Sequence, residues 1–299
     1  MRLTLVVNPA ATGVAGLRAL VSDALGAEHE VVVAETAARG DATGLAARAA
    51  AAGADVVVSL GGDGTANEVA NGLVGTGTAL AALPGGSTNV FARTIGFPNR
   101  TEQATEMLLA ALARGSRSRV GLGAVGNRRF LFHAGIGFDA RVIEMVERHS
   151  WAKHRVGPLA FAGAGLATWL GTADHPSFTV HAGDEAIDGR FAIVQNSDPY
   201  TYLGPRPLTV APEAGLGRPL AVAVFGDLGA ATLVPAICSA LAGGRRLREL
   251  PGVVVRDGLD RLTIDAAAAI GHQVDGDFLG ETSRIQISHD PECLDLVMP

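Results

Sequence analysis

The chain has 299 residues, of which 48% are hydrophobic and 18% are charged, and its formal net charge is −6. This balance is typical of a soluble globular protein with one large or two ordinary domains. It excludes a broad basic face for nucleic acid, so we expect no nucleic-acid partner.

The first ten residues, MRLTLVVNPA, carry an apolar run that is too short for a signal peptide. No apolar stretch reaches about 18 residues without Gly, Pro or a charge, so we expect no membrane span. Cys238 and Cys293 stand alone, without the spacing of a disulfide framework or a zinc site. A reducing cytoplasm is therefore the expected compartment.

In the first part of the chain, short aliphatic runs alternate with helical patterns. The runs predicted to be strands are RLTLVV (2–7), EVVVAE (30–35), DVVVSL (55–60) and ALAAL (79–83). Asp41 precedes one helical pattern as an N-cap, and Gly53 follows it. Thr101 and Gly115 occupy the same places around another. This alternation predicts four βα units and a parallel α/β sheet.

After about residue 117 the pattern changes to short alternating segments with turns, which predicts an antiparallel, β-rich second domain. The predicted strands are 119–125, 128–135, 177–183, 190–196, 207–212, 220–227, 252–255, 261–265 and 284–288. Helical patterns at 157–171 and 228–244 interrupt them, and Pro235 predicts that the second helix begins late or is kinked. A cleft between two domains is the natural place for a binding site.

The stretch VVVSLGGDGTANEVANGL (56–73) passes from a strand through glycines into a helical pattern. Gly61, Gly62 and Gly64 permit positive φ and let backbone N–H groups approach an anion. Thr65 and Glu68 fit a capping box, and the helix N-terminus also favours negative charge. Asp63 contradicts an anion site unless Mg²⁺ lies between, as on a nucleotide polyphosphate. The alternative is a tight turn in which Asp63 only binds local backbone donors.

Two further segments favour the hypothesis that these loops bind a phosphate group. NPAATG (8–13) and LPGGSTN (83–89) also follow predicted strands and mix glycine with small hydroxyl or amide side chains. Because the carboxyl ends of parallel strands share one edge of the sheet, we expect the three loops to converge there.

The segments VVNPAATG, SLGGDGTANEVANGL, ALPGGSTNVFAR, AGIGFDA and QVDGD appear in the order found in the diacylglycerol kinase catalytic family, which the chain resembles over most of its length. The resemblance implies an α/β plus β fold. Its N-terminal parallel α/β nucleotide domain, similar to those of phosphofructokinase and NAD kinase, would comprise residues 1–120 with a returning tail from about 285 to 299. An antiparallel β-rich lipid-binding domain would comprise residues 121–284.

The resemblance also implies site residues. The positions that match the family's ATP site are Asn8, Pro9, Thr12, Gly13, Thr36, Gly61, Gly62, Asp63, Gly64, Thr65, Asn67, Glu68, Gly86, Ser87 and Asn89. Asp63 falls on the invariant carboxylate and is the candidate Mg²⁺ ligand. Asp277 falls on the residue that resembles the general base, and Asp275 is the alternative.

Three departures from the family pattern stand out. Ser87 and Val90 replace the threonine and aspartate of P-x-G-T-x-N-D. Residues 217–219, Gly-Arg-Pro, replace an acidic pair and a glycine, which argues against a structural magnesium site like that of bacterial members. The usual D-G-E is D-G-D here, so the presumed base Asp277 is one methylene shorter.

The resemblance implies an ATP- and Mg²⁺-dependent kinase of a diacylglycerol-like or sphingoid-like hydroxyl, bound in the interdomain cleft. The alternatives are a kinase of a soluble alcohol, similar to NAD kinase, and a nucleotide- or lipid-binding regulator with impaired catalysis. The implied partner is a lipid, with peripheral contact at the inner face of the membrane, and a homodimer is left open. The helix at 157–171 has two readings, a buried helix or the lining of an acyl cleft. The basic cluster GGRRLREL (243–250) is read as a solvated face.

Overall fold

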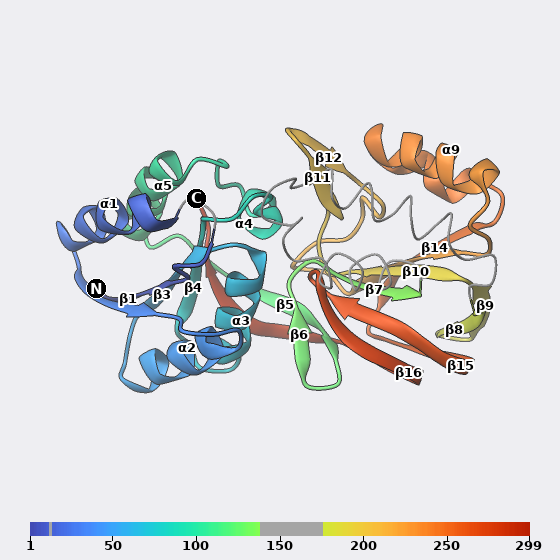
Figure 1. Ribbon diagram of the computed structural model, residues 1–299, viewed down its shortest axis with the longest axis horizontal. Helices are drawn as coiled ribbons and strands as arrows, with labels where there is room; N and C mark the ends of the chain where they lie inside the picture. Colours follow the sequence, from blue (N-terminus) through green and yellow to red (C-terminus); the bar gives the residue numbers. More distant parts are fainter. Residues whose placement is uncertain (12–13, 138–175) are drawn as a thin grey trace. The chain divides into compact units, whose positions relative to one another are not determined.

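The computed structural model describes residues 1–11, 14–137 and 176–299. They form two compact units (Figure 1). Unit 1 consists of Met1–Leu122 and Pro291–Pro299, and unit 2 consists of Gly123–Asp290.

Unit 1 is built on parallel strands in the order β4-β3-β1-β2. These are β1 (Arg2–Val7), β2 (Glu30–Glu35), β3 (Val56–Gly61) and β4 (Ala79–Pro84). Every residue of β3 and β4 is buried, as expected of parallel strands covered on both faces. The last part of β16 (Asp277–Val297) lies parallel to β4, with Leu296 opposite Leu80. The four strands predicted from the aliphatic runs are confirmed.

Helices cover both faces of this sheet. They are α1 (Val14–Gly26), α2 (Asp41–Ala51), α3 (Asp63–Leu73), α4 (Val90–Thr94) and α5 (Thr101–Ala113). Figure 1 shows α1 and α5 on one face and α2 and α3 on the other. The contact of α2 with α3 depends on Gly72, where an added Cβ would lie only 2.3 Å from the carbonyl oxygen of Thr43.

The helix ends match the predicted signals only in part. Gly53 and Gly115 follow α2 and α5 with positive φ, as predicted. The N-cap positions, however, are Gly40 and Arg100, one residue before the predicted Asp41 and Thr101, and neither makes a side-chain cap hydrogen bond. The predicted N-caps are therefore wrong, because both side chains bind backbone groups outside their helices.

Unit 2 is β-rich and antiparallel, as predicted. Its main path is β14-β13-β10-β7-β15-β16, with β8 paired to β15 and β9 paired to β8. The strands are β7 (His133–Gly137), β8 (Phe178–Ala182), β9 (Glu185–Gly189), β10 (Phe191–Gln195), β13 (Leu220–Phe225), β14 (Val253–Leu259) and β15 (Arg261–Val274). Strand β5 (Arg117–Val125) passes from unit 1 into unit 2, and the three-residue strands are β6 (Arg128–Phe130), β11 (Thr201–Leu203) and β12 (Arg206–Leu208). The predictions missed β9 and β11.

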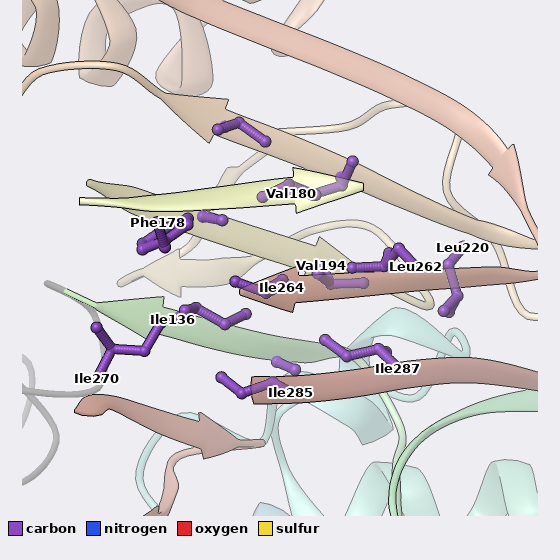
Figure 2. Packing of buried hydrophobic residues seen from close by; sticks show 14 of the residues in the cluster. Ile136, Phe178, Val180, Val194, Leu220, Leu262, Ile264, Ile270, Ile285 and Ile287 are labelled. Carbon is purple, nitrogen blue, oxygen red and sulfur yellow. The ribbon is translucent and has the colours of Figure 1, made fainter. Parts of the chain in front are cut away.

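Alternate residues of the central strands enter two cores, one on each side of the sheet. From β10, Ala192 and Val194 join the first core, and Phe191 and Ile193 join the second. Figure 2 shows the first core, which gathers aliphatic side chains from β7, β8, β9, β10, β13, β15 and β16. Helix α9 (Ala230–Leu241) and the 3₁₀ helix η1 (Arg245–Glu249) cover the second core.

The two helices predicted in this part of the chain have different outcomes. Helix α9 begins at Ala230 and contains Pro235, so it begins before the proline. The pattern at 157–171 lies outside the described residues. In the described part of the chain, no helix is long and apolar enough to cross a membrane.

Candidate functional site

The strand order of unit 1 defines one edge where a ligand is expected. The chain moves from β1 to β2 on one side and later to β3 on the other, and ligands of such sheets bind beyond the carboxyl ends of the strands at this switch point. Asn8 follows β1 there. Its N–H donates to the carbonyl oxygen of Leu60 (3.1 Å), and its side-chain amide donates to Thr65 Oγ1 (3.2 Å).

Two glycine-rich loops lie side by side at this edge: the first loop, residues 61–64, and the second loop, residues 85–89. The Gly85 N–H donates to the carbonyl oxygen of Gly61 at 2.8 Å. A Cβ at Gly86 would lie 2.7 Å from Gly62 Cα, so the contact needs glycine. At Gly64 an added Cβ would meet nothing within 4 Å. The first loop is thus packed on one side and open at the N-terminus of α3.

Glycine serves close packing here, and the positive φ that these residues permit is not used. Gly61, Gly62 and Gly64 all lack positive φ. At Gly61 a Cβ would instead lie 2.6 Å from Thr65 Oγ1. The missing side chains let the strand end, the helix start and the second loop approach one another.

Asp63 links the first loop to α4, which directly follows the second loop. Its Oδ2 accepts the Val90 N–H at 3.0 Å, and its Oδ1 accepts the Phe91 N–H at 2.9 Å. Burial raises the pKa of Asp63, while these N–H donors and the charge of Arg93 act in the opposite direction. The carboxylate therefore binds the start of α4, whose residues lie 27 and 28 positions away, and not only donors of its own turn.

Glu68 has a different role from the predicted capping box. Its Oε1 accepts the Gly40 N–H at 2.9 Å, and its Oε2 accepts the Ala42 N–H at 3.2 Å. The side chain is buried and binds the N-terminus of α2, whereas α3 begins after Gly62 without a side-chain cap. The capping-box prediction is wrong, because Glu68 binds N–H groups of the neighbouring helix and not of its own.

The other predicted ATP-site residues divide into internal and edge positions. Asn67 and Asn89 are buried, and Asn89 holds the second loop by exchanging two hydrogen bonds with Gly86 (2.8 and 2.9 Å). Ser87 is exposed at the tip of that loop. Thr36 follows β2 at the same edge, where its N–H donates to the carbonyl oxygen of Val7.

The start of the NPAATG segment is partly described. Pro9 is exposed directly after Asn8. Thr12 and Gly13 lie outside the described residues. The strand ends therefore gather Asn8, Thr36, the first loop and the second loop at one edge, as the sequence pattern predicted for its three loops.

In unit 2, Asp275 and Gly276 form the two-residue turn between β15 and β16, both with positive φ. This is the Asp-Gly arrangement that suits a tight hairpin. The buried Asp275 carboxylate accepts three backbone N–H groups, from Leu131 (2.6 Å), Phe132 (3.0 Å) and His133 (3.1 Å). Asp275 therefore anchors the 131–133 segment, which connects β6 to β7.

Asp277 begins β16 on the other side of the turn. Its Oδ2 lies 3.0 Å from Arg128 Nη2, and both side chains are partly exposed. The two acids thus have different surroundings: one binds backbone donors in the interior, and the other is oriented by a guanidinium group near the surface.

A buried polar cluster that the sequence reasoning missed follows β10. Asn196 Nδ2 and Ser197 Oγ both donate to the carbonyl oxygen of Leu131, so the segment that Asp275 holds by its N–H groups is also held by its carbonyl. Asp198 Oδ2 accepts the Thr209 hydroxyl at 2.9 Å. The run QNSDPY (195–200), polar directly after a strand, was the available signal.

Burial raises the pKa of Asp198 to about 6 from an ordinary value of 3.8. The folded chain then keeps this proton between about pH 4 and pH 6, where the unfolded chain has released it. Its contribution to stability is therefore complete below about pH 4 and is lost as the pH rises through about 6. In the wild type, this loss should lower the unfolding free energy by about 1–2 kcal/mol between about pH 4 and pH 6, after allowance for solvent screening. We expect Asp198→Asn to remove this decrease, because asparagine does not titrate.

Thermal melting of both proteins from pH 4 to pH 7 measures this effect. Asp184→Asn, an exposed aspartate in the same unit, is the control and should leave the pH profile unchanged. An Asp198→Asn protein whose pH profile matches that of the wild type would contradict the assignment.

Comparison with known proteins connects both units to one family. The model of the diacylglycerol kinase catalytic domain matches residues 2–124. A Pseudomonas aeruginosa protein named "probable lipid kinase YegS-like" is 30% identical over 311 residues, which cover 100% of this chain and 94% of that protein. The chain belongs to the diacylglycerol kinase family of lipid kinases. The resemblance inferred from the motifs is confirmed.

Other members of the kinase family match over shorter lengths. The diacylglycerol kinase of Bacillus subtilis is 34% identical, over 47% of this chain and 45% of its own length. A YegS-like protein of Chromohalobacter salexigens is 37% identical, over 46% of this chain and 44% of its own length. The chain therefore matches less than half the length of these two relatives.

The fold is that of solved proteins named as diacylglycerol kinases. Two crystal structures from Bacillus anthracis strain Sterne each cover 100% of this chain and are matched over 97% of their own length, with TM-scores of 0.79 and 0.73 and 20% identity. At this identity the likeness concerns the fold alone. It agrees with the parallel strands of the N-terminal part and the β-rich C-terminal part.

One departure from the lipid kinase pattern has a visible consequence. Where the sequence replaces an acidic pair by Gly-Arg-Pro, Arg218 Nη1 lies 3.0 Å from Glu213 Oε2. The arginine thus neutralises an acid of the same loop. Among the described residues, no three His, Cys, Asp or Glu side chains gather as a metal-binding group.

Proposed function

We propose that this chain transfers the γ-phosphoryl group of ATP to a hydroxyl of a diacylglycerol-like or sphingoid-like lipid. The observation that carries the proposal is the pair of touching glycine loops at the switch point of the unit 1 sheet. Ligands of open α/β sheets bind at such an edge, and a helix N-terminus there favours phosphate. The names of the full-length and partial relatives support a lipid acceptor.

In this proposal, the first loop and the N-terminal turn of α3 bind the polyphosphate through backbone N–H groups. Asn8, Thr36 and Ser87 supply side-chain hydrogen bonds at the same edge. Phosphoryl transfer needs mainly positioning and charge neutralisation, which this arrangement can supply. The domain limits for the nucleotide and lipid parts are proposed as 1–120 with about 285–299, and 121–284.

The residues at this edge fit Mg²⁺ in a limited way. Asp63 is the carboxylate of the first loop, and it binds the start of α4. A carboxylate has about four acceptor sites, which is more than these two N–H groups use. Mg²⁺ is commonly held by one or two carboxylates together with phosphate oxygens and water. Bound with the nucleotide, it would supply charge neutralisation, with Asp63 as the protein carboxylate.

Asp277 is proposed as the group that accepts the proton of the lipid hydroxyl. Phosphoryl transfer to an alcohol benefits from a carboxylate that takes the hydroxyl proton, and Arg128 fixes the direction of this one. Asp275, which binds three backbone donors, is proposed as the positioning residue of the same turn.

The deciding experiment follows radiolabelled phosphate from γ-labelled ATP into an organic extract or into water. Label in the organic phase with diacylglycerol or a sphingoid base supports the lipid kinase. Label that stays with a soluble alcohol such as NAD supports the first alternative. ATP or lipid binding without turnover across the lipid panel supports a regulator.

We expect Asp63→Asn to lower turnover more than tenfold and to destabilise the fold by about 1–3 kcal/mol, because the Val90 and Phe91 N–H groups bind different oxygens and the amide replaces one of these oxygens by an NH₂ donor. Asp41→Asn is a matched control. Asp41 Oδ2 alone accepts both the Ala37 and the Ala38 N–H, so one amide oxygen suffices. If Asp63 also contacts Mg²⁺, excess Mg²⁺ should restore part of the lost turnover. If the Asp63→Asn protein turns over at the wild-type rate, Asp63 does not contribute to the proposed ATP site.

A further inference from the structure

Helix α9 (Ala230–Leu241) has an unusual distribution of side chains. It carries no charged residue, and its two hydroxyl side chains, Thr232 and Ser239, are buried. A helix on a protein surface normally turns its polar residues to solvent. In α9 the polar residues face inward and the outward face is apolar.

The large exposed hydrophobic residues of α9 form one stripe. Val234, Ile237 and Leu241 are 57%, 52% and 38% exposed, and their spacing of three and four places them on one side of the helix. Ala236 and Ala240 are buried on the other side, where Ala236 joins the second core of unit 2. The core therefore explains one face of α9 and leaves the stripe without a structural role.

Arginines lie directly beyond the C-terminal end of the stripe. The turn at Gly243 and Gly244 leads into η1, where Arg245 and Arg246 are exposed and form no ion pair with a described residue. Arg248 is neutralised by Asp257. The acid nearest to these two arginines in η1 is Glu249. The prediction that residues 243–250 are only a solvated face does not explain why exposed arginines follow an exposed apolar stripe.

We propose that α9 and η1 form a membrane-contact surface. The stripe of Val234, Ile237 and Leu241 enters the boundary between head groups and acyl chains, and Arg245 and Arg246 meet the phosphates of an anionic bilayer. An apolar helix face with adjoining basic residues binds in this way, through buried apolar area and attraction to anionic lipid. Exposed arginines without an ion pair among the described residues fit an anionic surface. The choice of a bilayer rests on the proposed function, because the lipid acceptor resides there.

Flotation with two kinds of vesicle tests the surface: phosphatidylcholine alone, and phosphatidylcholine with about one third phosphatidylglycerol. The wild-type chain should bind the anionic vesicles more tightly, and added salt should weaken this binding. Ile237→Glu should lower the affinity for both kinds of vesicle about tenfold or more. Arg245→Gln with Arg246→Gln should remove the preference for anionic vesicles by a similar factor.

Leu20→Glu is the matched control, since Leu20 is 42% exposed on α1 of unit 1. It should bind vesicles like the wild type. All variants should keep the wild-type melting temperature, because the replaced side chains are exposed. The proposal is overturned if the Ile237→Glu protein binds vesicles as tightly as the wild type does. It is also overturned if the wild-type chain binds neither kind of vesicle. A dimer that Ile237→Glu dissociates, without vesicle binding, assigns the stripe to a second copy and also overturns it.

A kinase assay separates failure of this surface from failure of the proposed function. With a short-chain, water-soluble diacylglycerol, Ile237→Glu should turn over at the wild-type rate, and with vesicle-bound diacylglycerol it should be slower. Vesicle binding without any kinase activity would reject the proposed function and keep the surface. Turnover of the soluble acceptor without vesicle binding would keep the proposed function and reject the membrane-contact surface.

Discussion

Replacement of Asp275 by alanine should lower the free energy of unfolding by about 3–5 kcal/mol and the melting temperature by about 10 °C. The carboxylate accepts the N–H groups of Leu131, Phe132 and His133, and alanine would leave these donors without it in the interior. Asp275 also has a φ of 47°, which aspartate and asparagine tolerate better than alanine. Denaturant unfolding and thermal melting measure the loss.

Two variants give this prediction its controls. Asp275→Asn keeps one oxygen and the backbone preference, so its loss should be smaller, about 1–3 kcal/mol. Asp277→Asn, two residues along the chain and partly exposed, should melt like the wild type. An alanine variant within about 0.5 kcal/mol of the wild type would show that the three N–H groups find other acceptors.

Asp277→Asn should lower kcat about 10²-fold or more, on the proposed function, with little change in ATP affinity. An amide cannot accept the hydroxyl proton, yet it keeps the size of the side chain. Asp277→Glu should retain partial activity, because it keeps a carboxylate and has the side-chain length usual in the family. Steady-state kinetics with ATP and lipid varied in turn separate kcat from the two Michaelis constants.

Arg128→Gln tests whether the ion pair positions Asp277. It should lower kcat less than Asp277→Asn does, and Arg128→Lys should recover part of the loss. The opposite assignment has a clear signature. If Asp277→Asn is mild while Asp275→Asn folds normally and loses about 10²-fold in kcat, the proton acceptor is Asp275.

Local patterns were sufficient for most of the framework. The four parallel strands of unit 1 were predictable because each is a short aliphatic run between helical patterns. The antiparallel strands of unit 2 were mostly predictable from alternation and turns. The short strands β9 (EAIDG) and β11 (TYL) lack a long apolar run, so no periodic signal marked them.

The roles of the acidic side chains could not be predicted from local sequence. Asp63, Glu68 and Asp275 all bind backbone N–H groups more than 25 positions away. A capping box or a tight turn is read from neighbours three or four residues apart, so it cannot reveal such partners. The motifs indicated which residues matter, and only the tertiary structure shows what their carboxylates touch.

The 21-residue strand β16 also affects how the protein folds during translation. Leu294, Leu296 and Val297 are buried in unit 1, but the ribosome adds them after all of unit 2. Domains generally fold in order as they leave the ribosome. Here the first unit to emerge must wait for the last strand segment, and until then the edge of β4 that receives it is unpaired. The edge of β4 is therefore the place where a nascent chain is open to wrong pairing or to a chaperone.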